Sequence, residues 1–129
     1  MSVTITSFYA AISAFLIVYL AYRVANLRRL YQCGVGERDH RDLKVAVRVH
    51  GNTVENVLIT LFLMLMCELN GGNTIALVVV GAVMILSRLS HAWGMTVSGG
   101  RYSLFRISGI LANWCVILGL AVWSLVLIL

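Results

Sequence analysis

The chain has 129 residues, of which 60% are hydrophobic and only 12% are charged, and its mean hydropathy is +0.93. Soluble domains are about 45–50% apolar and about 25% charged, so this chain has too few polar side chains to cover a water-soluble globule. A membrane-spanning helix needs about 20 residues, which leaves room for four crossings and for no separate soluble domain. We therefore expect one all-α domain, residues 1–129, embedded in a membrane.

Four apolar segments of membrane-spanning length follow one another along the chain. They cover residues 3–26, 45–69, 74–95 and 104–129. Asn70-Gly71-Gly72-Asn73 is a turn signal that joins the second segment to the third, and Ser98-Gly99-Gly100 separates the third from the fourth. The sequence therefore predicts a four-helix membrane bundle whose second and third helices form a tight hairpin.

The basic residues are distributed unevenly between the two sides of this bundle. All ten Lys and Arg residues lie in or beside the first and third loops, and the N-terminus, the second loop and the C-terminus have none. Because cytoplasmic loops carry the excess of positive charge, we expect both termini on the non-cytoplasmic side. We therefore interpret the net charge of +5 as a signal that sets the orientation of the chain in the membrane, and we expect no nucleic-acid partner.

The three cysteines indicate neither a disulfide framework nor a metal site. Cys33, Cys67 and Cys115 are odd in number and lack metal-ligand spacing. Two of them lie in apolar stretches, where cysteine behaves as a small hydrophobic residue. We therefore expect no bound metal.

Several polar residues lie inside the predicted spans, where topology does not explain them. Arg48, Asn52 and Glu55 stand at positions i, i+4 and i+7, which places them on one face of the second helix. A charged side chain inside a membrane helix costs about 2.5–3.5 kcal/mol on insertion scales. Each of these charges therefore needs a partner, an aqueous cavity or a function.

The other intramembrane charges are expected at the same depth. Arg88 and His91 share a face near the end of the third helix, and Arg106 lies in the first turn of the fourth. Because neighbouring helices alternate in direction, these positions meet the start of the second helix at the cytoplasmic face. The result is a positive pocket whose guanidinium groups suit carboxylates, or alternatively a dry structural ion-pair network.

Three segments carry a family resemblance. Arg48-Val49-His50-Gly51-Asn52-Thr53-Val54-Glu55 resembles the R-x-H-x-N-x-x-E signature of the membrane-associated proteins in eicosanoid and glutathione metabolism (MAPEG). The segment from Gly81 to Gly94, with Arg88-Leu89-Ser90-His91 inside it, is similar to that family's G-x(6)-R-x-x-H-x-x-G stretch. Arg106-Ile107-Ser108-Gly109 resembles its R-x-x-G at the start of the fourth helix, so the resemblance covers nearly the whole chain.

The resemblance implies a homotrimer in a bacterial inner membrane, with glutathione bound as cofactor near the cytoplasmic face. A lipophilic small molecule would arrive from the bilayer. Arg106 matches the arginine that stabilises the glutathione thiolate and is the expected catalytic residue. The expected glutathione-binding residues are Arg48, Asn52, Glu55, Arg88, His91 and Arg28.

The charges of the predicted pocket agree with the ligand that the resemblance implies. Glutathione carries two carboxylates and one ammonium group, which match an arginine-rich pocket with a single glutamate. The leading hypothesis is a glutathione transferase or peroxidase that acts on lipophilic electrophiles. One alternative is a non-catalytic binding or scaffold protein that holds an anionic ligand or a lipid headgroup. A small-solute transporter is a third reading, which the apolar outer halves of the spans disfavour.

Overall fold

The computed structural model describes residues 3–129, which form four α-helices and no strand. All four helices are long and apolar enough to cross a membrane. They are α1 (Thr4–Leu30), α2 (Arg41–Leu69), α3 (Thr74–Val97) and α4 (Leu104–Ile128). The prediction of an all-α membrane bundle with four spanning helices is thereby confirmed.

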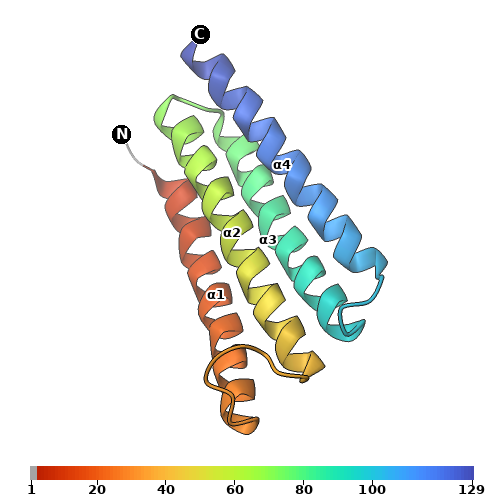
Figure 1. The fold of residues 1–129 in the computed structure, drawn as a ribbon. Helices are drawn as coiled ribbons and strands as arrows, with labels where there is room; N and C mark the ends of the chain where they lie inside the picture. The colour runs from red at the N-terminus through yellow and green to blue at the C-terminus, as the bar shows by residue number, and fades with distance from the viewer. Residues whose placement is uncertain (1–2) are drawn as a thin grey trace.

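The helices run antiparallel, side by side in chain order (Figure 1). Helix α2 packs against each of the other three, whereas α1 and α4 do not contact each other within residues 3–129. The loops 31–40 and 98–103 lie at one end of the bundle, and the 70–73 turn and both chain ends lie at the other (Figure 1). We call the end with the two Arg-containing loops the basic end.

Three of the helices end at a residue with left-handed backbone conformation. After α2, Gly71 has a φ of +78°, and the N–H of Gly72 donates to the carbonyl of Cys67 at 2.8 Å. Gly99, with a φ of +59°, has the same role after α3, and Gln32 has it after α1. Glycine adopts this conformation without a Cβ clash, so the two predicted turns end their helices with little conformational strain.

The helices extend beyond the predicted spans at the basic end. Helix α1 continues to Leu30 rather than stopping at residue 26, and α2 begins at Arg41 rather than at residue 45. The predicted spans follow the apolar segments, but the Arg and Leu residues that flank them are also good helix formers. A helix of 29 residues is about 43 Å long, whereas the hydrocarbon layer is about 30 Å thick, so α2 extends beyond the membrane.

The interior consists of two apolar clusters with a polar layer between them. The larger cluster comprises Tyr9, Met64, Cys67, Leu77, Met84, Val116 and Leu120. The smaller one, nearer the basic end, comprises Leu20, Val45, Val49 and Met95. Between the two clusters lie buried polar side chains from α3 and α4, among them Arg88 and Asn113. This layer contains part of the predicted site.

Candidate functional site

Arg88 is the centre of the buried polar layer, and its side chain is only 1% exposed. Its Nη1 donates to Oδ1 of Asn52 on α2 at 2.9 Å, and its Nη2 donates to the carbonyl of Gly109 on α4 at 2.8 Å. The Nε atom has no hydrogen-bond partner among residues 3–129. Within residues 3–129 no carboxylate oxygen lies within 4.0 Å of this guanidinium. Arg88 therefore ties three helices together through neutral acceptors.

Close packing of α3 on α4 brings the Gly109 carbonyl to Arg88. A Cβ atom added to Gly109 would lie 2.5 Å from the carbonyl oxygen of Ser87, and one added to Gly94 would lie 2.4 Å from the backbone nitrogen of Arg106. Real Cβ atoms essentially never approach that closely, so only glycine fits at these two positions. The glycines let the two backbones meet, as small residues do in membrane helix packing.

The polar layer continues away from the basic end through asparagine side chains. Asn56 donates from Nδ2 to the carbonyl of Asn52 at 2.9 Å and accepts from Nδ2 of Asn113 at 3.0 Å. The Ser87 hydroxyl donates to Oδ1 of Asn113 at 3.5 Å. Asn113 is not among the predicted site residues, although a carboxamide in the middle of an apolar span is itself a sign of interhelical hydrogen bonding.

Arg48 and Glu55 lie on the outer surface of the bundle rather than in this layer. Both side chains are exposed, and their seven-residue separation places them about 10 Å apart along the same face of α2. No Lys, Arg or His nitrogen of residues 3–129 comes within 4.0 Å of the Glu55 carboxylate. Glu55 is also the middle residue of the 29-residue α2, and the exposed Ile59 and Phe62 follow it on the same side.

The remaining predicted site residues make contacts within the chain. His91 is buried, and its Nδ1 has no hydrogen-bond partner in the part of the chain that the structure describes. Arg106 is half-buried and donates from Nη1 to the carbonyl of Gly100 at 3.0 Å, within the loop before α4. Arg28 donates to the carbonyl of Gly36 at 2.9 Å and so holds the loop after α1.

The structure thus brings some of the predicted residues together and leaves others apart. Asn52 and Arg88 are in direct contact, whereas Arg48 and Glu55 face outward with no charged partner among residues 3–129. The two outward charges and the free Nδ2 group of Asn52 suit a ligand that combines carboxylates with an ammonium group.

Two comparisons with known proteins place nearly the whole chain in a known family. The model of the MAPEG family matches residues 6–126, which reach into all four helices. Inner membrane protein YecN of Escherichia coli K12 is 35% identical over 114 residues, covering 88% of this chain and 85% of that protein. The protein of the same name from Escherichia coli O6:H1 matches with the same identity and coverage.

Proposed function

Because the chain belongs to the MAPEG family, we propose that it binds glutathione and uses it, as a transferase or a peroxidase, on lipophilic electrophiles. The protein is an integral, multi-pass membrane protein. We place it in a bacterial inner membrane, with both termini outside the cytoplasm. The name of its Escherichia coli relative supports the inner membrane, and the location of both Arg-containing loops at one end supports the orientation.

The outward-facing charges of α2 carry this proposal. Arg48 and Glu55 are exposed on a helix of membrane-spanning length, with no charged partner among residues 3–129. For a charge near the middle of a span, as Glu55 is, exposure to lipid costs about 2.5–3.5 kcal/mol on insertion scales. A single subunit in a bilayer would therefore be poorly solvated on this face. A polar ligand that pairs with the charges and a second protein surface that shields them from lipid would remove this cost.

A second copy of the chain is the covering surface that we propose, within a homotrimer. The face that carries Glu55 also exposes Leu58, Ile59 and Phe62, so an apolar contact can surround the charged positions. Burial between subunits would exclude lipid from the charges and leave a polar site open toward the basic end. Glutathione would then be held between neighbouring subunits.

The residues of this face fit the charges of glutathione. Arg48 offers a planar pair of donors for a carboxylate, and the Glu55 carboxylate is an acceptor for the ammonium group. Asn52 accepts from Arg88 at 2.9 Å through Oδ1, which leaves its Nδ2 group free to donate to the ligand. We assign Arg88 and His91, both buried, a positioning role behind these contacts. Arg28 holds the neighbouring loop.

Arg106 is the residue that we propose for activation. Glutathione, when bound, supplies a nucleophilic thiol. Arg106 lies in the first turn of α4, where the unpaired N–H groups of the helix add a partial positive charge. Its hydrogen bond to Gly100 fixes the guanidinium and leaves Nη2 free to stabilise an anion. A cation beside a thiol lowers its pKa and raises the thiolate fraction.

A glutathione-binding protein without turnover is the second candidate. The observation that favours it is that Nη1 and Nη2 of Arg88 and Nη1 of Arg106 already donate to acceptors of the chain itself. Under this reading the arginines build the pocket, and the ligand is held without ionisation of its thiol.

Calorimetric titration of glutathione into the detergent-solubilised oligomer tests the binding site. Glu55→Gln keeps the shape of the side chain but removes the charge that pairs with the ammonium group. We expect the loss of one charge-assisted hydrogen bond, about 1.5–3 kcal/mol, which weakens binding roughly 10- to 100-fold. Glu37→Gln, the same change in the loop before α2, serves as the control. Unchanged affinity of Glu55→Gln in an assembled oligomer, or no binding to the wild type, would contradict the proposal.

A further inference from the structure

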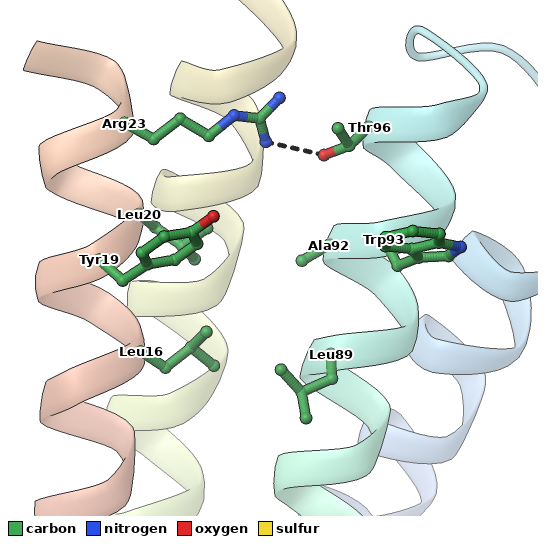
Figure 2. A pocket seen from close by; sticks show the side chains of 8 residues that line it. All are labelled: Leu16, Tyr19, Leu20, Arg23, Leu89, Ala92, Trp93 and Thr96. Atoms are coloured by element: carbon green, nitrogen blue, oxygen red, sulfur yellow. Dashed lines mark hydrogen bonds between the residues drawn. The ribbon is translucent and has the colours of Figure 1, made fainter. Parts of the chain in front are cut away.

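A groove of about 360 Å³ lies between α1 and α3 near the basic end, away from the outward charges of α2. Leu16 and Leu20 from α1 and Leu89 and Ala92 from α3 make its apolar part. Figure 2 shows Leu16 and Leu89 pointing toward each other at one end, while Arg23 reaches across the other end. The groove is therefore apolar along its length and cationic at one end.

Arg23 closes the groove through a hydrogen bond to α3 (Figure 2). Its Nη1 donates to the Thr96 hydroxyl at 2.8 Å, and no carboxylate oxygen of residues 3–129 lies within 4.0 Å of it. A guanidinium has five N–H donors, so most of its capacity remains available to an anion.

A second hollow, of about 350 Å³, adjoins the groove beyond Arg23. The two share Tyr19 and Arg23, and the second is also lined by Tyr22, Asn26 and Asp42. The Asp42 carboxylate accepts from the Tyr31 hydroxyl at 2.5 Å and from the backbone N–H of Leu43 at 2.9 Å. A carboxylate has about four acceptor sites, so Asp42 can accept further hydrogen bonds.

The order of these features, from the groove toward the basic end, matches the depth of a phospholipid in a bilayer. Arg23 follows about 20 residues of uncharged helix, which is the length that crosses the hydrocarbon layer. The apolar groove lies on the membrane side of Arg23, and Asp42 lies on the water side, near the start of α2. From the membrane outward, the surface is thus apolar, then cationic, then anionic.

We propose that this α1–α3 groove binds a phospholipid with a primary-amine headgroup. An acyl chain would lie along Leu16, Leu20 and Leu89. The phosphate would accept hydrogen bonds from Arg23, and the ammonium group, which lies farther from the acyl chains, would donate to Asp42. A choline headgroup cannot make the last contact because its quaternary nitrogen has no N–H. An anionic glycerol headgroup would bring no cation to Asp42.

Native mass spectrometry of the purified protein with added lipid tests the proposal. Phosphatidylethanolamine, phosphatidylcholine and phosphatidylglycerol of identical acyl chains are compared. We expect phosphatidylethanolamine to bind about tenfold more tightly than phosphatidylcholine, the order expected for one charge-assisted hydrogen bond. Asp42→Asn should remove that preference, and Arg23→Gln should weaken binding of both lipids. Arg38→Gln, the same change in an exposed loop residue, should leave binding unchanged.

A second variant locates the lipid without changing any charge. Ala92→Phe fills the apolar part of the groove and should weaken binding of all three lipids. This variant keeps the proposal testable if Arg23→Gln does not fold. Equal binding of phosphatidylethanolamine and phosphatidylcholine to the wild type, or tighter binding of phosphatidylglycerol, would overturn the proposal. A changed oligomeric state of Ala92→Phe would overturn it too, because the groove would then be an interface between copies of the chain.

Discussion

Asn113 shows how a single side chain can set the stability of the polar layer. It is fully buried and donates to Asn56 at 3.0 Å. Asn113→Ala leaves the Oδ1 atom of Asn56 without this donor, and interhelical hydrogen bonds in membrane proteins are worth about 0.6–2 kcal/mol. We expect a loss of that size in the free energy of unfolding, measured by denaturant titration in detergent micelles. Ser108→Ala, on the exposed side of α4, is the control.

A double-mutant cycle separates the hydrogen bond from general loss of packing. Asn56→Ala and Asn113→Ala together should cost less than the sum of the two single changes, because they remove the same hydrogen bond. Strict additivity would show that the two side chains act independently, contrary to the observed contact.

Tyr31 gives a pH-dependent prediction outside the membrane spans. Its hydroxyl donates to Asp42, and this hydrogen bond raises the pKa of Tyr31 above its ordinary value of about 10. Because the folded-state pKa is raised, the stabilising contact is present below the unfolded pKa and is lost as the pH rises through the folded pKa. Ultraviolet titration of wild type and Tyr31→Phe should reveal one tyrosine that ionises late. Disappearance of an early-ionising tyrosine in Tyr31→Phe would contradict this.

At the scale of the helix, Gly109 and Gly119 form a matched pair on α4. A Cβ at Gly109 would lie 2.5 Å from the Ser87 carbonyl oxygen, whereas one at Gly119 would meet nothing within 4 Å. We expect Gly109→Ala to lower the free energy of unfolding by about 1–3 kcal/mol, because α3 and α4 must separate. Gly119→Ala should be neutral or stabilising by up to about 1 kcal/mol, since alanine favours helix. Equal effects in thermal unfolding would refute the close contact of α3 with α4.

The start of α1 depends on a side chain from α2. The Glu68 carboxylate accepts from the backbone N–H groups of Ile5 at 2.9 Å and Thr6 at 2.8 Å, which are otherwise unpaired at a helix start. Glu68→Ala should cost about 0.5–2 kcal/mol, the usual value of a helix cap. Hydrogen exchange at these two amides should accelerate, with a smaller effect for Glu68→Gln. Unchanged exchange in Glu68→Ala would mean that water caps α1 equally well.

At the scale of the whole molecule, the features that the sequence predicted are those that depend on local hydrophobicity and charge. The four spans, the turns at residues 70–73 and 98–100 and the gathering of both Arg-containing loops at one end all follow from apolar runs, glycines and charge positions. The side of the membrane that each end faces stays a prediction. The helices continue beyond the predicted spans at the basic end because a helix can extend into water after its apolar residues stop.

The site could be predicted only as a set of residues at one depth. Helical spacing placed Arg48, Asn52 and Glu55 on one face, but it could not show that Asn52 turns inward to Arg88 while the other two remain exposed. That difference depends on the packing of α3 and α4 through Gly94 and Gly109, which is a tertiary property. The link between Asn56 and Asn113 was missed for the same reason.

The ultraviolet absorbance of the thiolate, recorded while glutathione is added to the purified oligomer at neutral pH, tests the central claim most directly. We predict that thiolate absorbance rises on binding to the wild type, because Arg106 lowers the thiol pKa from about 8.5. Arg106→Ser should bind glutathione mainly as the thiol, while Arg101→Ser, in the exposed loop beside it, should behave like the wild type. If wild-type protein binds glutathione with no rise in thiolate absorbance, the enzymatic account is contradicted.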